Sequence, residues 1–196
     1  MAIKLDKSGD SHKINLSKDA QELSVHVNLN WGAKSGGFFG KMMGGKKADL
    51  DLGCMYQLTN GAFDVIQPIG NRFGSKTESP FIFLDKDDRS GAASDGENLY
   101  IYKPSLLKRV MFFAFIYEGV ADFRSVNGRM FFKIGNGEEV TLELNNPGGN
   151  TRFCAAALIT NENQQLSIAK EERYFAGHQD ADAHYGFGFT WKAGSK

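Results

Sequence analysis

Acidic side chains are concentrated in two stretches of this 196-residue sequence. One is the segment 85–97, in which glycines at positions 91 and 96 can turn the backbone. The other is the short run Asp-Leu-Asp at positions 49–51. The carboxylates that could act as ligands together are Asp49, Asp51, Asp87, Asp88, Asp95 and Glu97. So many carboxylates repel one another unless a cation lies among their oxygens, and oxygen-only ligands favour Ca²⁺ over zinc or copper. The pattern therefore indicates a calcium site.

The acidic segment does not follow the EF-hand pattern. An EF-hand loop that started at Asp85 would need glycine at position 90 and a bidentate Glu at position 96, but this sequence has Ser90 and Gly96 there. It would also need flanking helices. Two interpretations are left. One is a loop of charges in contact with water, which is common for such segments. The other is a calcium site that Asp49 and Asp51 complete from a distant strand.

The residues around Asp49 and Asp51 have the pattern of a strand. In the segment 49–58 apolar residues occupy every second position, so one face would be buried. The two aspartates share the opposite face, about 7 Å apart along a strand, and both could reach one cation. The following Asn60-Gly61 pair is a strong hairpin signal and predicts a partner strand over residues 62–67.

Short apolar runs separated by turn signals continue along the chain. The run 109–117 is rich in strand formers and is predicted to be a central strand buried on both faces. Gly135-Asn136-Gly137 predicts another hairpin. Further strands are expected at residues 23–31, 81–84, 99–102, 130–134, 139–144, 153–160 and 166–174. The predicted fold class is all-β, an antiparallel β-sandwich with calcium-binding loops at one end.

The composition limits the number of domains, the partners and the location that can be expected. A hydrophobic content of 41% over 196 residues is enough for one globular domain, 1–196. Twenty-three basic residues balance 23 acidic residues, so we expect no nucleic-acid partner. Neither a signal peptide nor a membrane-spanning run is evident, and a cytoplasmic location is expected. Cys54 and Cys154 lie in apolar runs, which predicts buried, reduced thiols.

A Gly- and Lys-rich segment, 32–47, precedes the first aspartate pair and is expected to be mobile. Its large apolar residues are Phe38, Phe39, Met42 and Met43. Beside lysines, such side chains could enter an anionic membrane surface or a partner's groove. The alternative is that they fold back onto the domain.

A second group of potential metal ligands occurs near the C-terminus, where His178, Asp180, Asp182 and His184 alternate. On a strand all four would share one face, whereas on a helix only residues four apart would meet. A short helix is expected here, with capping and surface contacts as the main role of these residues.

Several separated motifs resemble the TerD-like family of tellurium-resistance and stress proteins. They are Asp-Leu-Asp-Leu at 49–52, Asp-Asp-Arg-Ser-Gly at 87–91, Gly-Glu-Asn at 96–98 and Phe-Ile-Tyr-Glu-Gly at 115–119. The ending, Tyr-Phe-Ala-Gly-His at 174–178 and Tyr-Gly-Phe-Gly-Phe-Thr-Trp at 185–191, is most similar to the TerA branch. The resemblance extends from Leu16 to Lys196.

The resemblance implies a calcium-binding β-sandwich that is not an enzyme. It also implies a role in bacterial stress responses together with other Ter proteins and membrane-associated components. Asp49 and Asp51 match the family's paired aspartates, and Glu118 stands at a position that is acidic in relatives, as a further ligand. The loop ligands that match are Asp87, Asp88, Asp95 and Glu97. The segment before Asp49 departs from the family's shorter acidic connection, which bears on whether one or two calcium ions bind.

Catalysis is the third hypothesis. The sequence has no Gly-x-Ser-x-Gly elbow and no phosphate-binding loop of the Walker type. A cluster of aspartates could in principle support metal-dependent hydrolysis, so this alternative stays beside the binding function and the membrane-binding function.

Overall fold

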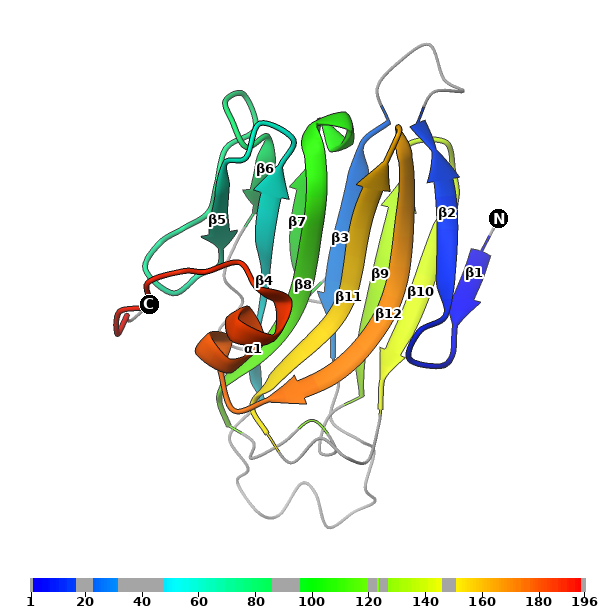
Figure 1. Cartoon of the computed structure of the whole chain (residues 1–196). Helices are drawn as coiled ribbons and strands as arrows, with labels where there is room; N and C mark the ends of the chain where they lie inside the picture. Colours follow the sequence, from blue (N-terminus) through cyan, green and yellow to red (C-terminus); the bar gives the residue numbers. More distant parts are fainter. Residues whose placement is uncertain are drawn as a thin grey trace.

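The computed structural model describes residues 2–16, 23–31, 48–85, 96–119, 123, 127–145 and 151–194. Within these ranges the chain forms two six-stranded sheets that pack face to face (Figure 1). Sheet A has the order β1-β10-β9-β3-β7-β6, and sheet B has the order β2-β12-β11-β8-β4-β5.

The strands of sheet A are β1 (Ala2–Leu5), β3 (Val25–Asn30), β6 (Ile82–Leu84), β7 (Glu97–Ile101), β9 (Gly128–Ile134) and β10 (Glu139–Leu144). Those of sheet B are β2 (Ser11–Asn15), β4 (Asp49–Leu58), β5 (Phe63–Ile66), β8 (Leu107–Glu118), β11 (Phe153–Glu162) and β12 (Gln165–Phe175). A short 3-10 helix, η2 (Pro104–Leu106), precedes β8, and the helix α1 (His178–Tyr185) follows β12.

The predicted all-β sandwich is confirmed, with one correction to its strand directions. Neighbouring strands are antiparallel, except that β1 runs parallel to β10, from the pair Ala2 and Glu139 to the pair Leu5 and Leu142. The sequence analysis did not predict β1 or β2. Both are short edge strands with few buried side chains, so they carry almost no alternating pattern. They lie at the same side of the molecule, where β1 ends sheet A and β2 ends sheet B.

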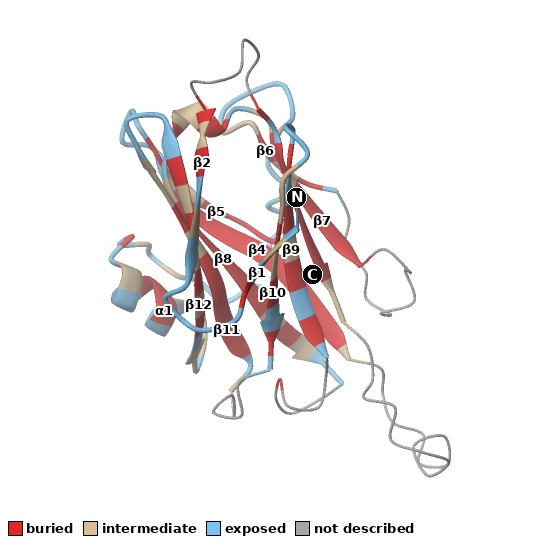
Figure 2. Cartoon of the chain, turned by 90° about the vertical axis from the view of Figure 1, so that its right-hand side faces the viewer, coloured by how far each residue is buried: buried red, intermediate tan, exposed pale blue. Residues whose placement is uncertain are grey.

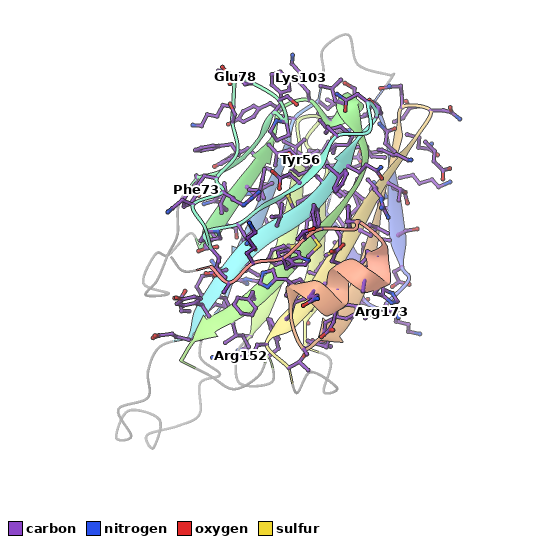
Figure 3. The ribbon with its side chains drawn as sticks, turned by 60° about the vertical axis from the view of Figure 1, so that its left-hand side comes forward. Tyr56, Phe73, Glu78, Lys103, Arg152 and Arg173 are labelled. Carbon is purple, nitrogen blue, oxygen red and sulfur yellow. The ribbon has the colours of Figure 1, made fainter. Side chains whose placement is uncertain are left out.

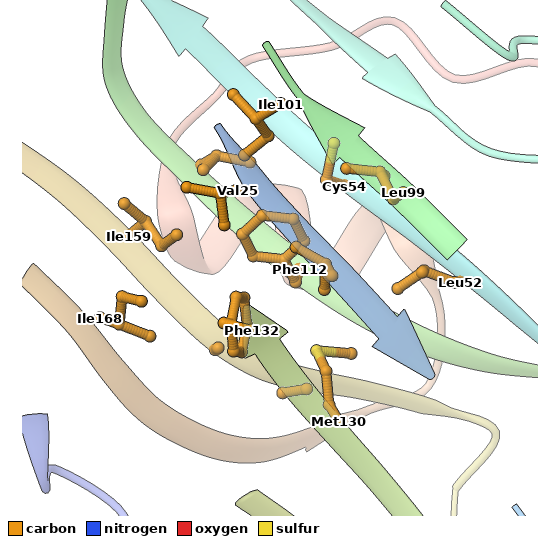
Figure 4. Packing of buried hydrophobic residues seen from close by; sticks show 14 of the residues in the cluster. Val25, Leu52, Cys54, Leu99, Ile101, Phe112, Met130, Phe132, Ile159 and Ile168 are labelled. Carbon is orange, nitrogen blue, oxygen red and sulfur yellow. The ribbon is translucent and has the colours of Figure 1, made fainter. Parts of the chain in front are cut away.

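The hydrophobic core lies between the sheets because alternate residues of each strand point inward (Figure 2). Phe112 of β8 and Phe132 of β9 meet edge to face across it, with ring centroids 5.2 Å apart. Figure 4 shows Leu52, Cys54 and Leu99 beside these rings. The predicted burial of both cysteines as free thiols is confirmed. Burial raises the pKa of each thiol far above its ordinary range, which keeps the thiols protonated.

A second apolar cluster covers the outer face of sheet B. Helix α1 and the segment 186–194 lie across this face (Figure 1). Met111 and Phe113 of β8 therefore pack outward against Ala181 and Phe187, and β8 is buried on both faces as predicted. In the described part of the chain, no helix is both long enough and apolar enough to cross a bilayer.

Candidate functional site

Several strand ends meet at one end of the sandwich, which we call the loop end. In sheet A, Leu29 near the end of β3 pairs with Glu97 at the start of β7. In sheet B, Asp49 at the start of β4 pairs with Glu118 at the end of β8. The loop end lies at the bottom of Figure 1, where β3 ends and β4 begins. Strand pairing thus brings acidic residues from distant parts of the sequence to the same end.

The two aspartates of β4 are buried at the loop end. Asp49 is 5% exposed and Asp51 is 1% exposed. As predicted, Leu50 and Leu52 belong to the core between the sheets, so strand alternation turns Asp51, which lies between them, to the other face of sheet B. Asp51 lies opposite Phe115, whereas Glu118, the register partner of Asp49, is exposed. A β-bulge between Asp49 and Leu50 marks this end of the strand.

Glu97 links the two sheets. It is the first residue of β7, it is 0% exposed, and it shares the inward face with Leu99. Its Oε2 accepts a hydrogen bond of 2.6 Å from the backbone N–H of Leu52 in β4. Strand β5 pairs with β4 only from Cys54 onward, so this N–H lies on the part of β4 that β5 does not cover. A hydrogen bond to a charged group contributes about 1.5–3 kcal/mol.

The backbone at Gly96 requires glycine. Its φ is +63°, and a Cβ atom there would collide with the backbone carbonyl of Leu29. The close approach to β3 and the left-handed conformation together exclude a side chain. They set the point at which the chain enters β7, and with it the position of the Glu97 carboxylate.

The acidic segment is closed at its base by Asp85. The Asp85 carboxylate accepts a hydrogen bond of 3.3 Å from the N–H of Asn98, and the Asp85 N–H donates to the carbonyl of Asn98 at 3.0 Å. The side-chain oxygen of Asn98 accepts a hydrogen bond from Asn28 and contacts the ring nitrogen Nε2 of His26, both at 2.8 Å. Asp85 thus holds the two ends of the acidic segment side by side on the edge of sheet A. This fits its exclusion from the predicted ligand set.

The segment 32–47 is likewise held at its two ends. The indole N–H of Trp31 donates a 3.0 Å hydrogen bond to the carbonyl of Ala48. Beside Trp31 is an open cavity of about 430 Å³, lined by Asn30, Asn127, Arg129 and Glu143 among others. No motif in the sequence indicated this cavity, because its lining comes from the ends of three strands that only the fold brings together.

Part of the predicted ligand set lies outside the described residues. Asp87, Asp88 and Asp95 are in this group, as are the predicted contact residues Phe38, Phe39, Met42 and Met43. Among the described residues, no three His, Cys, Asp or Glu side chains converge in a way that could hold a metal ion. Four predicted ligands, Asp49, Asp51, Glu97 and Glu118, lie at the loop end. The calcium site itself stays a prediction.

The C-terminal His and Asp residues lie on a short helix, as predicted, and they do not form a cluster of ligands. Asp182 accepts three hydrogen bonds from the segment that follows α1, at 2.8 to 2.9 Å. The donors are the N–H groups of Gly188 and Phe189 and the indole of Trp191. His178 instead packs among aromatic rings, with Phe115 at 4.8 Å and Trp191 at 5.3 Å between centroids.

Arg109 binds the C-terminal end of helix α1. Its guanidinium donates hydrogen bonds to the carbonyls of Tyr185 at 2.6 Å and Gly186 at 2.9 Å, and it lies over the Phe187 ring. A cation at the C-terminus of a helix also interacts favourably with the helix dipole. Together, Arg109 and Asp182 fix the C-terminal segment on sheet B.

Comparison with known proteins identifies the family to which this chain belongs. The chain is 34% identical over 198 aligned positions, covering 98% of its length, to the tellurium resistance protein TerA of Alcaligenes sp.. The chain is a Ter-family protein. The family resemblance inferred from its motifs is thus confirmed. No protein-family model matches the sequence. The Ter-family chain spans 58% of the length of this relative.

Proposed function

We propose that this Ter-family chain is a calcium-binding, non-enzymatic module of a tellurium-resistance type of stress response. Calcium would bind at the loop end and would set which partner proteins the module contacts. The observation that carries the proposal is the burial of three carboxylates, on Asp49, Asp51 and Glu97, at the end of the sandwich where the acidic segment is attached. The name of the TerA relative supports the stress-response part.

Burial of the carboxylates favours a cation at the loop end. Buried carboxylates are costly unless donors or a cation compensate them. All the acidic side chains at the loop end offer hard oxygen donors, which suit Ca²⁺ in number and type. Asp87, Asp88 and Asp95 would supply the remaining ligands from the segment whose base Asp85 closes. Glu118, which is exposed beside Asp49, would be an outer ligand.

A calcium ion at the loop end would join the two sheets through their loops. Glu97 belongs to β7 of sheet A, and Asp51 belongs to β4 of sheet B. Binding to the folded state alone stabilises a protein, by about 2.7 kcal/mol when the ligand is at 100 times its Kd. It would also change the charge and order of the surface offered to a partner. Other Ter-family proteins and membrane-associated complex components are the proposed partners, in the cytoplasm, and nucleic acid is not expected.

Calorimetric titration with CaCl₂ tests the site. The expected result is saturable binding that is weakened at least about tenfold, or about 1.4 kcal/mol, in Asp51→Asn. Asp180→Asn is the matched control, because Asp180 is an exposed aspartate on helix α1 and should leave binding unchanged. The absence of saturable heat in the wild-type protein, or equal binding by Asp51→Asn, would contradict the proposal.

Glu97→Gln separates the structural role of Glu97 from a ligand role. The amide oxygen of Gln can still accept the Leu52 N–H, whereas the negative charge is lost. We expect the fold to be retained in circular dichroism and calcium binding to be weakened. If calcium binding is unaffected, Glu97 is a sheet-linking residue only.

Two further functions are tested separately. Membrane contact would use the segment 32–47, which lies outside the described ranges, and metal-dependent hydrolysis would use the aspartates of the loop end. Contact of the segment 32–47 with an anionic membrane surface is tested by co-sedimentation with phosphatidylserine liposomes in calcium and in EDTA. A Phe38→Ser/Phe39→Ser variant is the comparison. Metal-dependent hydrolysis is tested with a panel of phosphoesters in calcium. Turnover that Asp51→Ala abolishes would replace the non-enzymatic proposal with a hydrolase.

A further inference from the structure

Asn98, the residue that follows Glu97, is buried on the outer face of sheet A. It is the third residue of the Gly-Glu-Asn motif at 96–98, and it is 5% exposed. Because Leu99 points into the core, strand alternation turns Asn98 outward. Helix α1 and the C-terminal segment lie on the outer side of sheet B (Figure 3), so neither of them covers Asn98. A buried amide requires hydrogen-bond partners, and the partners of Asn98 indicate its role.

The side chain of Asn98 is bonded to strand β3. Its Oδ1 accepts a 2.8 Å hydrogen bond from the amide Nδ2 of Asn28, which is the register partner of Asn98 and is 3% exposed. The same oxygen lies 2.8 Å from Nε2 of His26, and the His26 ring is stacked on Tyr100 with centroids 4.6 Å apart. Because Oδ1 is an acceptor, Nε2 of His26 carries the hydrogen in this contact. Two donors of β3 thus converge on one oxygen.

The backbone of Asn98 is bonded to the other end of the acidic segment. Its N–H donates to the carboxylate of Asp85 at 3.3 Å, and its carbonyl accepts a hydrogen bond of 3.0 Å from the Asp85 N–H. Asn98 therefore connects three parts of the chain that are separate in the sequence: strand β3, the first residue of the acidic segment and the last one. A single buried residue in this way ties both ends of the acidic segment to the sheet.

These contacts also bear on the position of Glu97. Gly96 lies against the backbone of β3, and Glu97 accepts the Leu52 N–H from the other sheet. With Asn98 bonded to β3 and Asp85, three successive residues are held from three directions. A shift of the backbone at Asn98 would move the Glu97 carboxylate, because the two residues share a peptide bond. Substitution of residues that orient a metal ligand typically lowers metal affinity about 10–100-fold.

We propose that Asn98 is a positioning residue of the calcium site. It does not bind the cation. It ties both ends of the acidic segment to β3, and it thereby keeps the Glu97 carboxylate in the orientation that binds calcium. The inference rests on the proposed calcium function and adds to it the residues that set the affinity, which are Asn98 and its partners Asn28 and His26.

Calorimetric titration of Asn98→Ala with CaCl₂ tests the proposal. The substitution removes the acceptor of two side-chain donors, and calcium should bind about 10–100-fold more weakly, with faster release in stopped-flow mixing with a chelator. Asn161→Ala is the matched control. Asn161 is a half-buried asparagine of β11, and its amide donates to the carbonyls of Ser105 and Leu107 at the opposite end of the sandwich. This control should lose stability but bind calcium as the wild type does.

A second measurement does not require calcium. Hydrogen exchange of the Leu52 amide, followed by NMR in EDTA, reports how firmly the Glu97 carboxylate is held. In Asn98→Ala this amide should exchange at least about tenfold faster than in Asn161→Ala. His26→Phe is the milder variant, and it serves if Asn98→Ala does not fold. It keeps a ring beside Tyr100 but lacks the N–H donor, so it should weaken calcium binding about two- to tenfold.

The possible failures can be told apart. Absence of calcium binding in the wild type would overturn the calcium function and the positioning role with it. If the wild type binds calcium and Asn98→Ala binds it equally well, only the positioning role of Asn98 is overturned. An unchanged Leu52 exchange rate in Asn98→Ala would do the same, because Glu97 would then keep its place without Asn98. Equal weakening in Asn98→Ala and Asn161→Ala would show a general loss of stability instead of positioning.

Discussion

Buried carboxylates occur in two settings in this protein, and the contrast between them separates structural acids from candidate ligands. Two of these acids lie away from the loop end. Asp182 accepts hydrogen bonds from three N–H groups. Glu172 forms an ion pair of 2.9 Å with Lys170 and accepts a hydrogen bond of 3.2 Å from the Tyr174 hydroxyl. At the loop end, Asp49, Asp51 and Glu97 are just as buried, and Glu97 comes shortly after the acids at positions 87, 88 and 95 in the sequence. The contacts of the first group lie far from the acidic segment and serve the fold. The second is where an external cation is proposed.

The largest expected loss of stability follows from substitution of Lys170, the cation that pairs with Glu172 of the first group. Its ammonium contacts Glu172 and donates to the carbonyls of Asp6 and Glu143 at 3.0 and 2.9 Å, so it ties β12 to the ends of β1 and β10. Lys170→Met leaves the Glu172 carboxylate buried without its cation. We expect a loss of about 3–5 kcal/mol in unfolding free energy, measured by urea denaturation.

The size of the Lys170 effect should not depend on calcium. Lys13→Met, at an exposed lysine of β2, is the control and should change stability little. Adding Glu172→Leu to Lys170→Met should recover part of the loss, because it removes the uncompensated charge. A Lys170→Met variant that is as stable as the wild type would show that the pair is not what holds this edge of the sandwich.

The next largest effect is expected at Asp182. Asp182→Ala removes the acceptor for Gly188, Phe189 and Trp191 together, which should cost about 2–4 kcal/mol and release the C-terminal segment from sheet B. In a Trp31→Phe background, in which Trp191 is the only tryptophan, the fluorescence should shift to longer wavelength at the same time. Asp180→Ala, on the exposed side of the helix, should change neither measurement.

Asp51 should behave in the opposite way. Without calcium, Asp51→Asn is expected to change stability little, because the Asn side chain has the same size and its amide oxygen can still accept a hydrogen bond. Calcium at about ten times its Kd should stabilise the wild type by about 1.4 kcal/mol and the variant by much less. Thermal melts in calcium and in EDTA measure both values. Loss of stability in EDTA alone would place Asp51 with the structural acids.

The strands could be predicted from the sequence where the alternation of apolar and polar residues, or an apolar run, extended over many residues. Strand β4 was predicted over its full observed range, and the buried strand β8 and two hairpins were predicted from apolar runs and Asn or Gly turns. Strands β1 and β2 were missed because edge strands of four and five residues bury too few side chains to show a period.

The candidate site could be predicted in part. The carboxylates are visible in the sequence, and alternation predicted the face of β4 on which Asp51 lies. The inter-sheet hydrogen bond from Leu52 to Glu97 could not be predicted, because it depends on how two sheets pack.

The smallest expected effect concerns His178, which the sequence analysis treated as a surface or metal-binding residue. Its ring lies against Phe113, Phe115, Phe153 and Trp191, and burial lowers its pKa to about 4. The unfolded chain would bind a proton at His178 near pH 6.5, whereas the folded protein would not until about pH 4. Stability linked to His178 is therefore fully present above pH 6.5 and falls as the pH decreases toward 4.

The pH dependence can be assigned by substitution. Between pH 7 and pH 5.5 the loss that His178 causes should be about 1 kcal/mol, measured by urea denaturation at each pH. His178→Phe keeps a flat ring in the aromatic cluster and cannot be protonated, so it should remove that part of the slope. His184→Gln, at an exposed position of the same helix, should retain it. Equal slopes in His178→Phe and the wild type would mean that His178 stays accessible to protons in the folded state. The aromatic rings around His178 would then not exclude water from the outer face of sheet B, where the Asp182 contacts lie.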